Sequence, residues 1–222
     1  MSPRIAVAVA SSGHCKTQFA MSLAGLMAYF SAKPLAVEGE GQEISQFCVE
    51  SSGIAHNQNQ LVRLAREWKA THIMWVEDDM QFPPDSLHRL FAWRQPWVGA
   101  NYAMRSGPPF EYVALGLDKK RVFTGAKSSG LEEVLYTGYG CTLMEMSIFD
   151  KIEKPYFEHK WIGDDVYCTT DAYLADKVRS AGVKIYVDHD LSKHVGHVGS
   201  HVYKCLEVEA WKNSQLESSN GK

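Results

Sequence analysis

The acids Glu77, Asp78 and Asp79 are consecutive and follow directly after the apolar run His72–Val76. A continuous apolar run of this length is typical of a strand that is buried on both faces of a sheet. Because an unpaired charge in the core costs several kcal/mol, we expect the acids at the open carboxyl end of this strand. Ligands bind at that edge in open α/β sheets. A solvated acidic turn is the common explanation of an isolated acidic triplet, but the position after a buried strand favours a binding edge.

Three adjacent carboxylates repel one another unless a cation compensates their charge. Their hard oxygen atoms suit Mg²⁺ or Mn²⁺, and such an ion typically also holds the phosphates of a substrate. A second group of candidate metal ligands lies near the end of the chain, where histidines fall in a short run that lacks HExxH spacing. These histidines are His189, His194, His197 and His201.

The bulk composition suits one α/β domain. The chain has 222 residues, of which 45% are hydrophobic. We place the domain at residues 1–212 and expect a polar, flexible tail at 213–222. The net charge of -3 does not indicate a general nucleic-acid binder, although a local basic patch is compatible with it.

The cysteine pattern and the hydropathy pattern indicate the cellular compartment of the protein. The cysteines number five, are widely scattered and form no CxxC pair, which predicts reduced thiols and a cytoplasmic location. Nowhere do eighteen apolar residues follow one another, so we expect no membrane span.

Strands and helices are expected to alternate along the chain. Short apolar runs predict strands at Ile5–Ala10, Ile44–Glu50, His72–Val76, Trp97–Asn101 and Val183–Val187. Two further strands, antiparallel to each other, are expected at Glu111–Leu117 and Arg121–Thr124. Helical periodicity predicts helices at Lys16–Phe30, from a Ser51 or Ser52 cap to about Trp68, at Asp85–Trp93, and from Asp164–Asp165 to about Ala181.

Several other residues have both a functional and a structural interpretation. The polar cluster His56–Asn59 is either a nucleotide contact or a polar helix face. Arg105, in a Gly- and Pro-rich loop, is either an anion contact or an ordinary surface arginine. Gly138 and Gly140 allow the backbone to approach a ligand closely, or they serve a bulge.

Four segments in this order resemble the GT-A fold of nucleotide-sugar-dependent glycosyltransferases, close to the large inverting family 2 and its short single-domain versions from phage and bacteria. The segments are SSGIAHNQNQLVRLA, MWVEDDMQFPPDSLHRL, TGYGCTLMEMSIFDKI and IGDDVYCTTDAYLADKVRSAGVKIYVDHDLSKHVGHVG. The stretch VGANYAMR, between the second and third segments, adds to the resemblance. The resemblance implies a Rossmann-like α/β fold, in which helices flank a mixed, mostly parallel central sheet beside a small antiparallel element.

The resemblance also implies a metal site. EDD is similar to the DxD motif of the family, which places Asp79 at the metal-binding position and Glu77 at the position that faces the ribose or the metal. Asp78 is the alternative to Glu77 in this role, because a glutamate at that first position departs from the usual aspartate. GHVG is similar to the late histidine that completes the metal site, which favours His197 over His194.

The remaining site residues also follow from the resemblance. GDD is similar to the motif that carries the general base, which predicts Asp165 as the base and Asp164 as its neighbour. Gln58 and Asn59 lie where relatives often have Arg-Asn, and with Ser11 and Arg105 they are expected to contact the nucleotide.

The implied reaction is transfer of a sugar, with inversion, from a nucleoside diphosphate sugar to an acceptor hydroxyl. UDP is favoured because it is common in the family. The acceptor stays open between a glycan, a protein, a lipid-linked sugar and a modified DNA base. One alternative is a nucleotidyltransferase, although SSGHCK offers only Gly13 and Lys16 of the Gly-rich basic loop that such an enzyme needs. The other is a non-catalytic module that binds nucleotide sugars.

Overall fold

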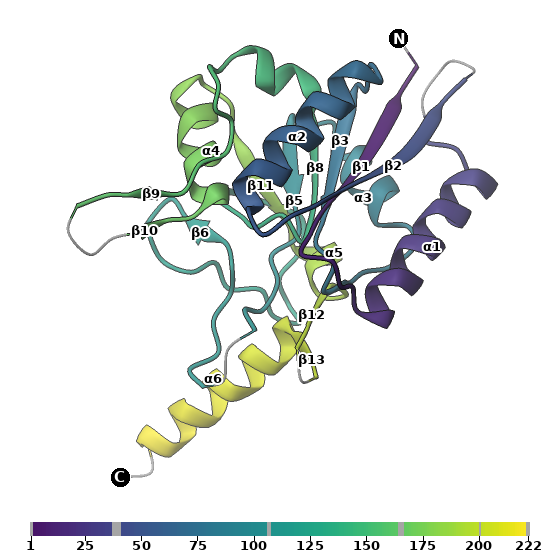
Figure 1. Ribbon diagram of the computed structural model, residues 1–222. Coiled ribbons are helices and arrows are strands. Elements are labelled where there is room, and N and C mark those ends of the chain that lie inside the picture. The colour runs from purple at the N-terminus through teal and green to yellow at the C-terminus, as the bar shows by residue number, and fades with distance from the viewer. Residues whose placement is uncertain (1, 37–40, 106–107, 164–166, 200, 221–222) are drawn as a thin grey trace.

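An eight-stranded mixed sheet forms the centre of the protein (Figure 1), with the strand order β2-β1-β3-β8-β5-β11-β7-β6. The computed structural model describes residues 2–36, 41–105, 108–163, 167–199 and 201–220. Strands β7 and β8 run opposite to the other strands of this sheet. The strands are β1 (Arg4–Ser11), β2 (Glu43–Glu50), β3 (His72–Val76), β5 (Trp97–Gly99), β6 (Leu115–Gly116), β7 (Leu131–Tyr136), β8 (Cys141–Glu145) and β11 (Ile185–Asp188).

Two small antiparallel sheets accompany the central one. The first is a hairpin of β9 (Lys160–Trp161) and β10 (Tyr167–Cys168). The second has β12 (Gly196–Val198) between β13 (Val202–Lys204) and β4 (Met80–Gln81). Together with the mixed central sheet and its helices, these elements confirm the fold class that was expected from the sequence.

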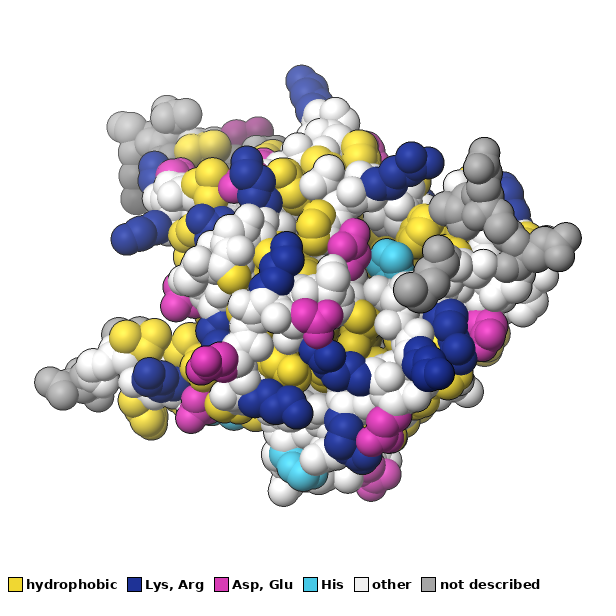
Figure 2. Space-filling view, turned by 90° about the horizontal axis from the view of Figure 1, so that it is seen from above, with side chains coloured by type: hydrophobic (Ala, Val, Ile, Leu, Met, Phe, Trp, Pro, Cys, Tyr) yellow, Lys and Arg dark blue, Asp and Glu magenta, His cyan; other side chains and the backbone are white. Residues whose placement is uncertain are grey.

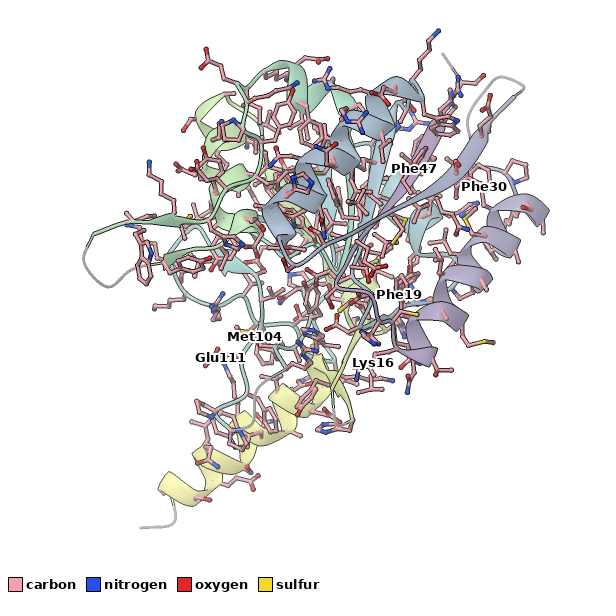
Figure 3. All side chains as sticks on the ribbon, viewed as in Figure 1. Lys16, Phe19, Phe30, Phe47, Met104 and Glu111 are labelled. Atoms are coloured by element: carbon pink, nitrogen blue, oxygen red, sulfur yellow. The ribbon has the colours of Figure 1, made fainter. Side chains whose placement is uncertain are left out.

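Helices cover both faces of the central sheet (Figure 1). The helices are α1 (Thr17–Ala32), α2 (Ile54–Glu67), α3 (Ser86–Ala92), the 3-10 helix η1 (Met146–Asp150), α4 (Thr170–Ser180), α5 (His189–Ser192) and α6 (Cys205–Asn220). Helices α2 and α4 pack on one face, and α1 and α3 on the other. Phe19 and Phe30 of α1 belong to the second layer (Figure 3).

Strand β3 contributes to both layers, as its apolar sequence predicts. Ile73 and Trp75 pack in the layer of α2 and α4, whereas Met74 and Val76 pack in the layer of α1 and α3. All four side chains are buried. Since successive side chains of a strand point to opposite faces, this burial leaves no place for the following acids within the sheet.

Two expectations about local structure are wrong. Helix α4 begins at Thr170 and not at Asp164–Asp165, because Tyr167–Cys168 pairs with β9 as a strand. Gly53, and not a serine, is the N-cap residue of α2. Residues 213–220, where a polar, flexible tail was expected, form the end of helix α6.

The hairpin expected between residues 111 and 124 is also largely absent. Leu115 and Gly116 pair with β7, and Arg121 makes a single bridge to Leu115. Gly182, just after α4, has a φ of 80°, a backbone conformation in which glycine commonly ends a helix.

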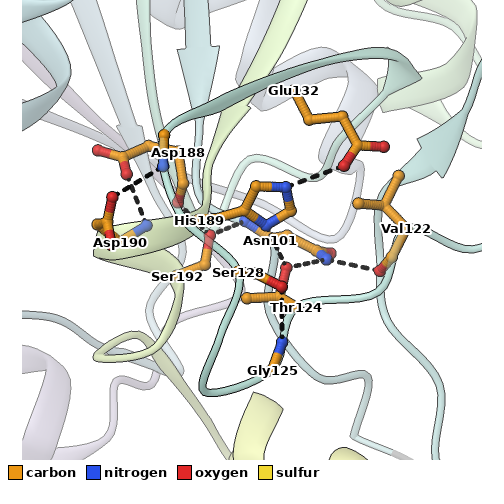
Figure 4. Close-up of polar contacts among 11 residues, drawn as sticks. Asn101, Val122, Thr124, Gly125, Ser128, Glu132, Asp188, His189, Asp190 and Ser192 are labelled. Carbon is orange, nitrogen blue, oxygen red and sulfur yellow. Dashed lines mark hydrogen bonds and ion pairs between the residues drawn. The ribbon is translucent and has the colours of Figure 1, made fainter.

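A buried polar network holds the segment that leads from β5 toward Arg105 (Figure 4). The Asn101 side chain donates to Val122 O and to Thr124 Oγ1, both at 2.9 Å. Thr124 Oγ1 lies 2.9 Å from Nδ1 of His189, whose Nε2 lies 3.0 Å from a carboxylate oxygen of Glu132. Because these buried groups satisfy one another, the segment has a fixed position against α5.

The surface seen in Figure 2 intersperses Lys and Arg side chains with Asp and Glu, in keeping with the small net charge. None of the described helices is long and apolar enough to cross a membrane.

We expect His72, at the start of β3, to make the stability of the protein dependent on pH. Burial lowers the pKa of His72 below its ordinary value of 6.5, an effect that the charge of Glu145 opposes. Its contribution to stability is therefore present above about pH 6.5 and is lost as the pH falls through the folded-state pKa. Urea unfolding between pH 5 and pH 7 should show a shallower pH dependence for His72→Gln than for the wild type. His194→Gln, at an exposed histidine, is the matched control and should leave the slope unchanged.

Candidate active site

The acidic turn lies at the carboxyl end of β3, where a cavity of about 370 Å³ opens. The ends of β1 and β2, the start of α2 and two further side chains, Arg105 and His197, also line this cavity. Because β1, β2 and β3 are parallel neighbours, their carboxyl ends meet at one edge of the sheet. The fold therefore places the acids where the sequence predicts a binding edge.

Pairing of β4 with β12 carries His197 to the acidic turn. His197 pairs with Met80, the residue after Asp79, and Val198 N donates to Asp79 O at 2.7 Å. As a result, Nε2 of His197 lies 3.3 Å from Oδ2 of Asp79. His194, the alternative candidate, is exposed and does not line the cavity.

Two cationic or potentially cationic groups face the same oxygen of Asp79. An Nη atom of Arg105 lies 2.7 Å from Oδ2, the oxygen that His197 also approaches. Burial raises the pKa of Asp79, but the hydrogen bond and charge of His197 and the charge of Arg105 outweigh it. The net pKa of Asp79 therefore lies below its ordinary value, and the carboxyl is ionised near neutral pH.

The imidazole of His197 lies between two acceptors. Its Nδ1 lies 3.2 Å from the carbonyl oxygen of Ala103, and its Nε2 faces the Asp79 carboxylate. A neutral imidazole has a single N–H, so it cannot donate to both. When Nδ1 donates to Ala103, the lone pair of Nε2 points at Asp79, and a cation between the two atoms would remove the repulsion. A histidine that binds metal typically donates its other N–H to a carbonyl in this way.

The donor set fits a divalent ion that relies on substrate for the rest of its coordination. Neighbouring ligands of an octahedral ion with bonds of about 2.1 Å are roughly 3 Å apart. The separation of 3.3 Å between Asp79 Oδ2 and His197 Nε2 is close to that spacing. Within the described part of the chain, no group of three or more His, Cys, Asp or Glu side chains is arranged to hold a metal. Asp79 and His197 would therefore hold Mg²⁺ or Mn²⁺ together with phosphate oxygens.

Asp78 binds the end of β1 to the acidic turn. Ser11 Oγ donates to Asp78 Oδ2 at 2.7 Å and accepts from Gly13 N at 3.0 Å, and Lys16 N donates to Asp78 O at 2.9 Å. Ser11 and Asp78 both line the cavity, so the structure brings these two expected nucleotide contacts together.

Asn57 is a cavity residue that was not singled out within the polar cluster. Its amide donates to Ser11 O at 3.1 Å and to Ser51 O at 3.2 Å. It therefore joins the ends of β1 and β2 at the cavity wall. In the sequence, the polar cluster His56–Asn59 was the feature that indicated a contact. The direction of each side chain around the axis of α2 decides which member of the cluster faces the cavity.

The structure does not bring Gln58 and Asn59 to the cavity. Gln58 is buried, and its Oε1 has no hydrogen-bond partner among the described residues. The Asn59 amide group donates to Phe157 O at 2.8 Å and accepts from Tyr156 N at 3.0 Å. Asn59 therefore anchors the segment after η1 and does not line the cavity, and its contact with a nucleotide stays a prediction.

Glu77 lines the cavity and lies beside Tyr102. Tyr102 OH donates to Glu77 Oε2 at 3.4 Å and accepts from Gly140 N at 3.1 Å. Burial and the neighbouring charge of Asp79 raise the pKa of Glu77 to about 7. In the absence of a cation, Glu77 therefore takes up a proton more readily than a surface glutamate does.

The two glycines before β8 make room for Tyr102. A Cβ atom on Gly138 would lie 2.1 Å from Tyr102 OH, and one on Gly140 would lie 2.8 Å from Cζ of the same ring. The two glycines therefore leave space for the ring of Tyr102. This space positions the Tyr102 hydroxyl that donates to Glu77.

Asp164 and Asp165, the expected base and its neighbour, lie outside the described residues. The described carboxylate at the start of α4 is Asp171, in the first turn of the helix. Its charge contributes to the raised pKa values of Glu77 and Tyr139. Tyr139 OH, in turn, lies 3.4 Å from the carbonyl oxygens of Thr170 and Asp171. The start of α4 therefore faces the buried side of the acidic turn.

The comparisons with known proteins concern the fold. No protein-family model and no curated protein matches this sequence. Among solved structures, the chain is similar to A197 from STIV with a TM-score of 0.56 and 14% identity, over 89% of this chain and 86% of that chain. It is also similar to GalNAc-T7, crystallised with UDP, GalNAc and Mn²⁺, with a TM-score of 0.48 and 11% identity, over 93% of this chain but 45% of that one. The likeness to A197 shows a shared fold, and the function has to be argued from the site.

We expect Gly138→Ala to destabilise the protein by about 1–3 kcal/mol, because the added Cβ would overlap with the buried Tyr102 hydroxyl. Urea unfolding at constant pH measures this change. Gly25→Ala is the matched control. Its Cβ would meet only Pro84 Cβ, at 3.5 Å, so helix propensity should leave stability unchanged or slightly higher. Equal effects of the two substitutions would show that Tyr102 does not need this space.

Proposed function

We propose that this protein is a glycosyltransferase that uses a divalent cation and a nucleoside diphosphate sugar. One observation carries the proposal: Asp79 and His197, which are 118 positions apart, meet at the cavity with an ionised carboxylate facing an imidazole nitrogen. The sequence resemblance to the GT-A fold of the inverting family 2 supports the same conclusion. UDP is the favoured nucleotide and Mn²⁺ or Mg²⁺ the favoured ion.

In this proposal the cavity binds the nucleotide part of the donor. Serine hydroxyls at the ends of β1 and β2, which the Asn57 amide holds together, offer hydrogen bonds to the nucleoside. Asp79 and His197 hold the cation, and Arg105 offers a planar fork of N–H donors to the phosphates. A cation held by these two residues would supply neutralisation of the charge on the leaving diphosphate.

An acceptor hydroxyl needs a base on the side of the anomeric carbon away from the diphosphate. Asp165 is the base that the sequence resemblance favours. Asp171 is supported by a different observation, because it occupies the first turn of α4 and its charge reaches Glu77. Either carboxylate would take the proton of the acceptor hydroxyl as that oxygen attacks the sugar.

Incubating the protein with a panel of nucleoside diphosphate sugars and Mn²⁺ tests the proposed reaction through the nucleoside diphosphate that is released. We expect release that depends on Mn²⁺, and a loss of at least about 100-fold in Asp79→Asn, because the uncharged amide is a poor ligand for a hard cation. Asp190→Asn is the control, at a surface aspartate paired with Lys193. Undiminished release after chelation of the metal would contradict the proposed role of the cation.

The two candidate bases can be separated by measuring donor binding and turnover in Asp165→Asn and Asp171→Asn. The substitution that removes the base should lower turnover by about 100-fold or more with little change in donor affinity. We expect this result for one of the two variants and a small effect for the other. If both variants lost donor affinity and turnover in parallel, these carboxylates would be structural.

A further inference from the structure

The backbone that leads to Arg105 is held in place at the edge of the cavity. The preceding residues are fixed, because Met104 N donates to Glu111 O at 2.8 Å and Ala103 O faces Nδ1 of His197. The stem of Arg105 passes over Gly199, where an added Cβ would lie 3.0 Å from Arg105 Cγ and 3.2 Å from Cδ. A Cβ at position 199 would crowd both this stem and the ring of Tyr203, whose Cε2 would lie 2.8 Å away.

The guanidinium and a divalent cation would compete for one oxygen atom. Oδ2 of Asp79 already faces Arg105 at 2.7 Å and His197 at 3.3 Å. A cation bound between Asp79 and His197 would use this same oxygen as a ligand. The cation and the guanidinium would then lie within a few ångströms of each other, where like charges repel strongly.

In the proposed complex, the diphosphate is a second anion that the Arg105 side chain can bind. Its side chain is 47% exposed, whereas those of Asp79 and His197 are 16% and 14% exposed. It also lines the cavity in which the diphosphate would lie. Phosphate oxygens accept the N–H donors of a guanidinium as readily as a carboxylate does.

We infer that Arg105 alternates between two anions. It neutralises Asp79 when the cation is absent, and it moves to the diphosphate when the cation and nucleotide are bound. This inference rests on the proposed function, and it adds that Arg105 couples the two ligands. The cation alone binds weakly because it must displace Arg105, whereas the nucleotide accepts the displaced guanidinium. Each ligand therefore raises the affinity for the other.

Calorimetry with Mn²⁺ alone, and with UDP in the presence of Mn²⁺, tests this coupling on the wild type and on Arg105→Gln. Without nucleotide, we expect Arg105→Gln to bind Mn²⁺ about fivefold more tightly, because its competitor is gone. With Mn²⁺ present, we expect the same variant to bind UDP about tenfold more weakly, because a charged contact to phosphate is lost. A structural role alone would not move the two affinities in opposite directions.

Two further variants control the experiment. Arg63→Gln removes the same charge from an exposed ion pair with Glu67 on α2 and should change neither affinity. Arg105→Lys keeps the charge but loses the planar fork, so it should bind Mn²⁺ as weakly as the wild type and bind UDP with intermediate affinity. Thermal melting establishes that each variant is folded.

The outcomes distinguish this inference from the proposed function. If the wild type binds Mn²⁺ through Asp79 but Arg105→Gln binds it no more tightly, the alternation is overturned and the metal site stands. If neither protein binds Mn²⁺, with or without UDP, both the alternation and the metal-dependent function are overturned. Tight binding of Mn²⁺ by Arg105→Gln, where the wild type binds it weakly, supports both.

Discussion

The short pairing between β4 and β12 is the constraint on which the candidate site depends. Without it, Asp79 and His197 would lie at the ends of separate loops. The backbone bond from Val198 to Asp79 and the pairing of His197 with Met80 hold the two side chains at one edge of the central sheet. Strands this short are stable only because the larger sheet and α1 support β4 from behind, with Met80 fully buried in that layer.

Three neighbouring acids share this edge, and each is accommodated by different chemistry. Asp78 accepts a hydroxyl hydrogen bond from Ser11, Asp79 faces Arg105 and His197, and Glu77 is buried beside Tyr102 with a raised pKa. The repulsion between the three carboxylates is therefore reduced by a hydroxyl, a guanidinium, an imidazole and a proton. Such an arrangement leaves the site ready for a cation, because a divalent charge would relieve the remaining repulsion.

The parts of the protein that surround the site differ in how firmly they are held. The segment after β5 is fixed by the buried Asn101 network and by the contact of His197 with Ala103. Arg105 follows this fixed segment, yet its own side chain is half exposed. An exposed charged side chain on a fixed segment is suited to exchange partners when a ligand enters.

Much of the fold of this protein could be predicted from its sequence. Apolar runs of strand length, such as His72–Val76, report burial on two faces directly, so the α/β class, the acidic edge and most strands could be predicted. The pairing of Asp79 with His197 rather than His194 was favoured by resemblance. The tertiary structure decided which polar side chains share a cavity, because helical phase separates Asn57 from Asn59 and strand pairing places Tyr167–Cys168 before α4. The first outcome depends on how α2 packs against the ends of β1 and β2, and the second on the pairing of Tyr167–Cys168 with Lys160–Trp161.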